Sequence, residues 1–101
     1  MLLLAILSTG ESYGYELVTR LQAAGLADIG AGTVYPVLTR LEREGTISSR
    51  LVASTSGPAR KYYVLTTHGH QTLTLAADAW RGLANTVEPL LAGAVSSQEL
   101  Q

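Results

Sequence analysis

The sequence predicts a mainly helical α+β fold in which three short helices precede a β-hairpin and one long helix. Three observations lead to this class. Apolar residues recur at helical spacing in residues 1–44. Between residues 46 and 65 apolar and polar residues mostly alternate on either side of a Ser/Thr/Gly/Pro-rich turn, as in two paired strands. From residue 66 onward, apolar residues three and four positions apart indicate a long helix.

The first two helices are expected to begin the core. Met1–Leu7 is continuously apolar and ends at Ser-Thr-Gly, which favours a short buried helix. Ser12 is expected to cap a second helix over Tyr13–Ala24, and Gly25 is its predicted stop. The inward stripe of this helix consists of Leu17, Val18 and Leu21. Gly14 has no side chain, so it would allow the close approach of another backbone.

A flexible connection over residues 25–32 leads to a third helix, predicted over Thr33–Glu44 and ended by Gly45. Pro36 is acceptable in its first turn, because N–H groups there have no helical partner. The predicted inward face consists of Val34, Val37, Leu38 and Leu41. The residues left facing outward are Thr33, Tyr35, Thr39, Arg40 and Arg43.

The hairpin follows directly. Thr46–Val52 alternates like a half-buried strand, and Arg60–Leu65 is a second strand rich in Tyr and Val. Ala53–Ala59 has turn chemistry, which predicts a tip of roughly seven residues. Because Tyr62 and Tyr63 point in opposite directions, one of them should lie in the core.

Thr66 is expected to cap the final helix. Its apolar seam, with the spacing of a coiled coil, consists of Leu73, Ala76, Trp80, Leu83, Val87 and Leu90. A domain this small has used its own core by this point, so the seam is predicted to meet a second copy of the chain. Packing on the helix's own domain is the alternative. Pro89 should kink or end the helix near its C-terminal turn. The expected organisation is residues 1–65 as the first unit, residues 66–92 as a dimerisation helix and residues 93–101 as a frayed tail.

Composition restricts the class of protein. A chain of 101 residues is most simply one domain with a modest core, and a hydrophobic fraction of 47% argues against disorder. The absence of cysteine excludes disulfides and thiolate metal sites. The opening apolar run is too short to span a bilayer and lacks the basic lead-in and cleavage site of a signal peptide. We therefore expect a cytoplasmic protein without a membrane partner.

The charge is unevenly distributed. Between residues 40 and 61, five basic and two acidic residues give +3, which leaves −4 on the rest of a chain whose net charge is −1. The basic residues are Arg40, Arg43, Arg50, Arg60 and Lys61. A basic face on an acidic body fits a nucleic-acid phosphate footprint. On charge alone, an ordinary solvated surface is the alternative.

The sequence offers little material for an active site. It contains no Gly-rich phosphate loop, nucleophile elbow or carboxylate pair, so an enzyme is not expected. His68 and His70 are two positions apart and would point to different sides of a helix, which argues against a metal site. We expect them at the surface or an interface, and we expect no cofactor.

Three motifs resemble the PadR family of bacterial transcriptional regulators. They are YGYEL at Tyr13–Leu17, GTVYPVLTRLEREG at Gly32–Gly45 and GPARKYYVLT at Gly57–Thr66, with Gly69 after the cap also fitting. The resemblance covers about residues 2–92 and implies a winged helix-turn-helix followed by a dimerisation helix, as in the smaller subgroup of that family. This chain departs from the family pattern at its start, where family members usually carry several polar residues before the first helix.

A winged helix places its third helix in the major groove of double-stranded DNA. Four outward side chains are the best placed for DNA contact: Thr33, Tyr35, Thr39 and Arg40. Arg40 is the first candidate for a base contact, because its donors match N7 and O6 of guanine. Thr33 and Tyr35 are expected to touch phosphates, and Arg43 either touches DNA or pairs with a carboxylate.

The resemblance also implies DNA contacts outside that helix. Gly57 shapes the tip of the hairpin, and Arg60 and Lys61 face the phosphate backbone or the minor groove. Tyr15 is expected either to touch a phosphate or to be a buried tyrosine with a satisfied hydroxyl. A dimer would bind an inverted repeat whose half-sites lie about one helical turn apart.

The resemblance favours a repressor relieved by a small-molecule effector. Some small PadR-like regulators hold flat aromatic drugs between two tryptophans at the dimer interface, and Trp80 lies at a similar place, so a planar aromatic effector is one expectation for it. Core packing of Trp80 is the alternative. For the whole chain, the alternative function is a winged-helix module that binds protein rather than DNA, because the fold alone does not fix function.

Overall fold

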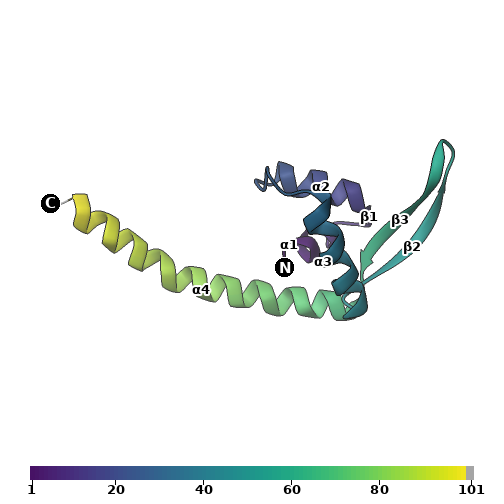
Figure 1. The fold of residues 1–101 in the computed structure, drawn as a ribbon. Coiled ribbons are helices and arrows are strands. Elements are labelled where there is room, and N and C mark those ends of the chain that lie inside the picture. The colour runs from purple at the N-terminus through teal and green to yellow at the C-terminus, as the bar shows by residue number, and fades with distance from the viewer. Residues whose placement is uncertain (100–101) are drawn as a thin grey trace.

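A computed structural model describes residues 1–99 of the chain (Figure 1). The elements, in chain order, are α1 (Leu2–Leu7), β1 (Ser12–Tyr13), α2 (Gly14–Ala23), α3 (Ala31–Arg43), β2 (Ile47–Ser54), β3 (Gly57–Leu65) and α4 (Thr67–Glu99). The three short helices gather beside the base of the hairpin, the hairpin projects to one side, and α4 leaves on the other. The predicted class, mainly helical with a hairpin and a long last helix, is confirmed.

The core lies where the three short helices meet the base of the sheet. Its buried apolar side chains are Leu3, Leu4, Leu7, Leu17, Val18, Leu21, Val34, Leu38, Leu41, Ile47, Tyr63 and Leu65. The predicted inward stripes of α2 and α3 therefore pack together, with Val37 partly buried against them. Of the two adjacent tyrosines in β3, Tyr63 is the one in the core, as the alternation requires.

The sheet has a strand that the sequence did not predict. β1 pairs antiparallel with β3 through Ser12–Tyr63 and Tyr13–Tyr62, so the strand order is β1-β3-β2. The predicted cap at Ser12 is wrong. Ser12 is buried in β1 and its hydroxyl donates to the carboxylate of Glu16, while α2 begins at Gly14 without a side-chain cap. A strand of two residues is too short to show an alternating pattern.

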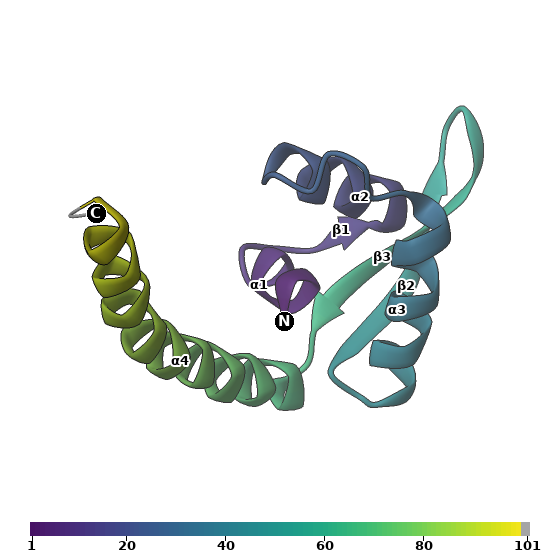
Figure 2. The ribbon, with the colours of Figure 1, turned by 60° about the vertical axis from the view of Figure 1, so that its left-hand side comes forward.

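The predicted hairpin tip is too long. Pairing continues to Ser54–Gly57, and Thr55 and Ser56 form the loop, so the two strands project well beyond the core (Figure 2). Ladder hydrogen bonds need no apolar side chain, which is why turn-like residues continue the strands here. The register shifts between Val52 and Ser54. Pro58, which has no N–H, lies in this irregular stretch, where a missing donor is tolerated.

The junction between the sheet and α4 is tightly closed. Thr66 caps α4 as predicted: its hydroxyl oxygen accepts the Gly69 N–H at 3.0 Å and donates to the Gly45 carbonyl at 2.6 Å. The Thr66 N–H also donates to the Thr46 carbonyl at 3.2 Å. Gly69 is buried against this carbonyl. The start of α4 is therefore fixed to Gly45 and Thr46, the residues that connect α3 to β2.

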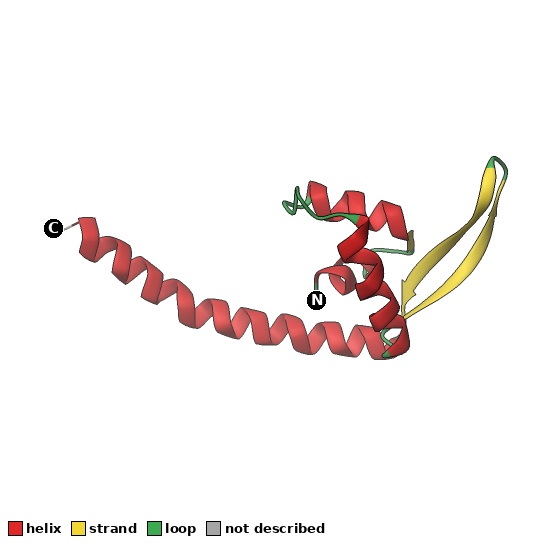
Figure 3. Cartoon of the chain, in the orientation of Figure 1, coloured by secondary structure: helices red, strands yellow, loops and turns green. Residues whose placement is uncertain are grey.

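α4 continues to Glu99 (Figure 3). The expectation that Pro89 ends the helix is therefore wrong, and so is the expectation of a frayed tail for residues 93–99. Residues 100–101 of the predicted tail lie outside the described residues. A proline removes one hydrogen bond to the preceding turn, and the Leu- and Ala-rich residues after it continue the helix. Figure 2 shows α4 as one continuous, gently curved helix. Within residues 1–99, no helix has the combined length and apolar character needed to cross a membrane.

Most of the predicted seam on α4 is uncovered in the single chain. Leu73 packs partly against the core, but Trp80, Leu83 and Leu90 are 57%, 55% and 69% exposed. Packing of the whole seam on its own domain, and core packing of Trp80 within the chain, are therefore both excluded. Within residues 1–99, Ala76 and Val87 are half-buried, and the larger seam side chains from Trp80 onward are left exposed.

Candidate nucleic-acid interface

The exposed side of α3 is polar. Thr33, Tyr35, Thr39, Arg40 and Arg43 are all exposed, as the spacing predicted. α3 begins at Ala31, two residues earlier than expected, and its N-cap is Gly30. The hydroxyl of Thr39 donates to the carbonyl oxygen of Tyr35 one turn earlier at 3.1 Å. The helix therefore presents a mixed aromatic, hydroxyl and guanidinium surface.

A hollow of about 420 Å³ opens between α3, the start of α2 and the hairpin. It is lined by Tyr13, Gly14, Tyr15, Tyr35, Ala59, Arg60, Lys61 and Tyr63. Four predicted DNA-contact residues are thus brought together from three segments: Tyr15, Tyr35, Arg60 and Lys61. Tyr15 is 64% exposed, so its alternative as a buried tyrosine is wrong.

Gly14 shapes this hollow. A Cβ placed there would lie 2.6 Å from the ring of Tyr35, so the missing side chain gives the ring its place over the first turn of α2. The close approach predicted at Gly14 is therefore made by an aromatic side chain rather than by another backbone. Because Tyr35 lies on α3, this contact fixes the start of one helix against the exposed face of the other.

The two hairpin cations have different surroundings. The guanidinium of Arg60 lies 4.6 Å from the centroid of the Tyr13 ring, which itself meets Tyr62 edge-on at a centroid distance of 5.5 Å. A cation over an aromatic face is held in place without a charge partner, so its full positive charge remains. Lys61 instead donates to the carboxylate of Glu42, with 2.9 Å between Nζ and Oε1.

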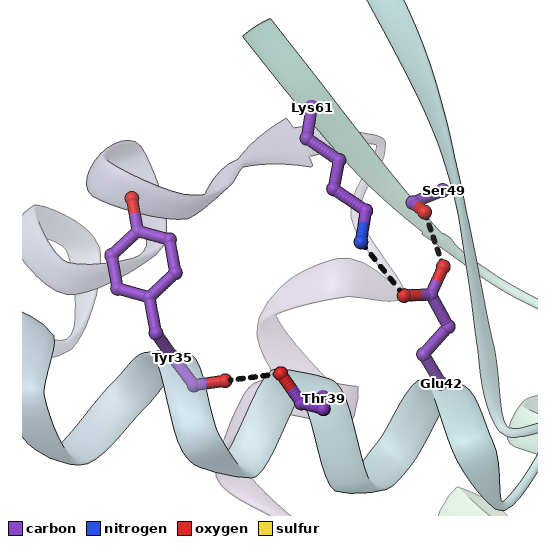
Figure 4. Close-up of polar contacts among 5 residues, drawn as sticks. All are labelled: Tyr35, Thr39, Glu42, Ser49 and Lys61. Atoms are coloured by element: carbon purple, nitrogen blue, oxygen red, sulfur yellow. Dashed lines mark hydrogen bonds and ion pairs between the residues drawn. The ribbon is translucent and has the colours of Figure 1, made fainter.

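Glu42 on α3 joins the helix to both hairpin strands (Figure 4). The hydroxyl of Ser49 on β2 donates to Oε2, and the ammonium of Lys61 on β3 donates to Oε1. The Ser49 hydrogen bond first, and then Lys61, lower the pKa of the Glu42 carboxyl below its usual value. The pKa of Lys61 is raised, chiefly by the hydrogen bond to Glu42. Both groups are therefore charged at neutral pH.

Arg40 and Thr33 lie apart from this hollow. Together with Val37 they border a second, mostly apolar hollow of about 250 Å³ beside α1 and the connection before α3. Arg40 Nε lies 3.6 Å from Glu44 Oε1, and both side chains are more than half exposed. Within residues 1–99, Arg43 makes no ion pair, so its carboxylate-pairing alternative finds no partner.

The remaining predicted residues lie farther out. Gly57 begins β3 directly after the two-residue loop, at the tip of the hairpin. His68 and His70 are exposed in the first turn of α4, and the described residues contain no cluster of three or more potential metal ligands.

The sequence did not reveal four residues of this interface: Tyr13, Glu42, Ser49 and Tyr63. The spacing of Tyr35, Thr39 and Glu42 by four and three was a usable signal, because it places Glu42 on the helix face that carries the two predicted contacts.

Comparison with known proteins decides the family. The family model described as "Transcriptional regulator PadR-like family" matches residues 3–75. The chain belongs to this family. PadR-like proteins are transcriptional regulators and not enzymes, which confirms both the resemblance and the expectation that the chain does not catalyse a reaction. Among curated proteins, none matches the sequence.

Solved PadR-like structures share the fold across most of the chain. A PadR-like transcriptional regulator from Bacillus cereus is 40% identical, with a TM-score of 0.81 over 88% of this chain and 86% of that one. A PadR family regulator from Clostridium difficile is 31% identical, with a TM-score of 0.78 over 89% and 94%. Bacillus subtilis PadR, solved in complex with operator DNA, is 28% identical, with a TM-score of 0.66 over 72% of this chain and 41% of that one.

Proposed function

We propose that the chain is a dimeric, sequence-specific DNA-binding regulator that represses transcription until a small effector releases it. The observation that carries the DNA proposal is the hollow beside α3, where two hairpin cations and three exposed or half-exposed tyrosines meet. Bacillus subtilis PadR, which shares the fold, was solved on operator DNA. A protein-binding face would be expected to carry apolar side chains, whereas this one is polar and basic.

In this proposal α3 enters the major groove and the hairpin lies along the backbone. Arg40 and Arg43 are the candidates for guanine, and the exposed Arg40–Glu44 pair is open to exchange with a base edge. Tyr15, Tyr35 and Thr33 supply hydroxyls for phosphates, which set the register on the duplex. The Thr39 hydroxyl already donates to Tyr35, so its oxygen remains free to accept from an amino group on a base edge. Gly57 lets the hairpin tip approach the DNA backbone closely.

Replacing Arg60 with Ala is expected to weaken binding to random-sequence duplex DNA and to make its salt dependence shallower. Removing one phosphate-binding cation reduces the slope of log K against log salt by about 0.9. Fluorescence anisotropy over a salt series measures both effects. Arg81→Ala is the matched control, since Arg81 is an exposed cation on α4 paired with Asp78. A wild-type protein that does not bind DNA at low salt would refute the proposed function. An unchanged salt slope in Arg60→Ala would show that Arg60 on the hairpin makes no phosphate contact.

The dimer would form through the seam on α4, with Leu73, Ala76, Trp80, Leu83, Val87 and Leu90 facing the partner. Exposed apolar side chains along one face of a 33-residue helix support this pairing. Two-fold symmetry would then present two α3 helices to an inverted-repeat operator whose half-sites lie about one helical turn apart.

Trp80 is the proposed contact for a planar aromatic effector. Trp80 is 57% exposed, and the small residues Ala76, Ala77 and Ala79 leave space beside it. We expect planar dyes to quench the fluorescence of Trp80, the only tryptophan in the chain, and Trp80→Leu to abolish the rise in dye anisotropy. Tyr62→Leu, an aromatic change on the hairpin, should leave dye binding intact. Fluorescence that stays unquenched at high dye concentration would contradict an effector role at Trp80.

A further inference from the structure

A carboxylate lies on the surface that is proposed to meet DNA. Glu42 is on α3, one turn after Thr39 and two turns after Tyr35, and Figure 4 shows its carboxylate between the side chains of Ser49 and Lys61. DNA is densely negative, so a charge of this sign at such a surface opposes binding. Its place needs a physical explanation.

The carboxylate is held there from two sides. Ser49 on β2 and Lys61 on β3 each donate to one of its oxygens, so it cannot rotate away from the hairpin without losing a hydrogen bond. The pair is nevertheless accessible, because the side chains of Lys61 and Glu42 are 48% and 31% exposed. Lys61 therefore meets an approaching phosphate with its charge already matched by Glu42.

We propose that Glu42 limits the sequence-independent affinity for DNA by neutralising Lys61. The inference rests on the proposed DNA-binding function. Non-specific binding comes almost wholly from cations that replace counterions on the phosphates, whereas operator binding adds contacts to base edges. Neutralising one hairpin cation therefore weakens binding at every sequence by a similar factor, and DNA without base contacts depends on such phosphate contacts alone. Arg60, which lies over Tyr13, keeps its charge for the backbone.

The opposite function for the same contact is a structural one. If Glu42 serves only to hold the hairpin against α3, removing its charge loosens the hairpin and weakens DNA binding. If Glu42 restrains binding, removing its charge frees Lys61 and strengthens it. The two functions therefore differ in the sign of one measurement.

The test is a charge cycle on the full chain with random-sequence duplex DNA. The variants are Glu42→Gln, Lys61→Gln and the double variant, each compared with wild type by anisotropy over a salt series. Gln keeps the size of Glu and an oxygen that accepts from Ser49. One additional phosphate contact raises affinity by about fivefold to tenfold near 0.1 M salt and steepens the salt slope by about 0.9. We expect these values for Glu42→Gln, weaker binding for Lys61→Gln, and near wild-type binding for the double variant.

Glu88→Gln is the matched control, because it changes the net charge equally at an exposed position on α4. We expect it to leave the affinity and the slope unchanged. Thermal unfolding of every variant checks that the fold is retained. Unchanged or weaker binding by Glu42→Gln, when the wild type binds, would overturn this inference alone. If neither protein binds DNA at low salt, the proposed function fails together with it.

Discussion

Replacing Gly69 with Ala is expected to destabilise the chain by about 3 kcal/mol, near the upper end of the range for overpacked sites. A Cβ at this position would overlap the carbonyl oxygen of Thr46 and lie 2.9 Å from its carbonyl carbon. Both atoms belong to the backbone, so no side-chain rotation relieves the overlap. The first turn of α4 would have to move away from β2, which would break the hydrogen bond from Thr66 to Thr46. In a chain of this size, the melting temperature should fall by more than about 10 °C.

Gly82→Ala is the control for helix propensity. Gly82 is in the same helix, and a Cβ there would meet nothing within 4 Å. Alanine favours a helix interior over glycine by about 1 kcal/mol, so this variant should be equal to or more stable than wild type. Circular dichroism during heating compares the two. Equal stability of both variants would show that the junction is looser than described.

Breaking the α4 seam is expected to convert the proposed dimer into a monomer. Leu83→Glu together with Val87→Glu would place two carboxylates per chain in an apolar interface, where an unpaired charge is strongly disfavoured. Sedimentation equilibrium should report half the wild-type mass. Because two linked DNA-binding units gain affinity from binding both half-sites together, DNA affinity should fall by about 100-fold or more.

Asn85→Glu provides the matched control for this change. It adds a carboxylate to the same stretch of α4, at an exposed position off the seam. It should keep the wild-type mass and bind DNA with only a small loss. A wild-type chain that sediments as a monomer at micromolar concentration would contradict the dimer, whatever the variants do.

Features that depend on residues nearby in the sequence were predictable. The inward stripe of α2 and the cap at Thr66 follow from helical spacing and from local hydrogen bonding, and the structure contains both. The wrong predictions concern residues whose structure depends on a partner far away in the sequence. Ser12 resembles a helix cap in isolation, but pairing with Tyr63, far away in the sequence, makes it a strand residue.

The candidate site was predictable only in part for the same reason. The outward positions on α3 follow from the helical spacing of its apolar residues. The neighbouring sequence does not indicate that Tyr35 lies toward the hairpin while Arg40 borders a different hollow. The partner of Lys61 lies 19 residues earlier in the chain, on another element. An ion pair of this kind depends on how the hairpin packs against the helix, which a pattern along one segment does not record.

The closed junction at Thr66 and Gly69 makes α4 a lever. Its 33 residues span about 50 Å at the usual helical rise, so a tilt of only about 5° displaces one end by about 4 Å relative to the other. A hinge would need free volume at the pivot, and the backbone of Thr46 fills the space where even one methyl group would go. In the proposed dimer, a change in the angle between the two α4 helices would therefore be transmitted to the sheet and α3, and would alter the separation between the two α3 helices.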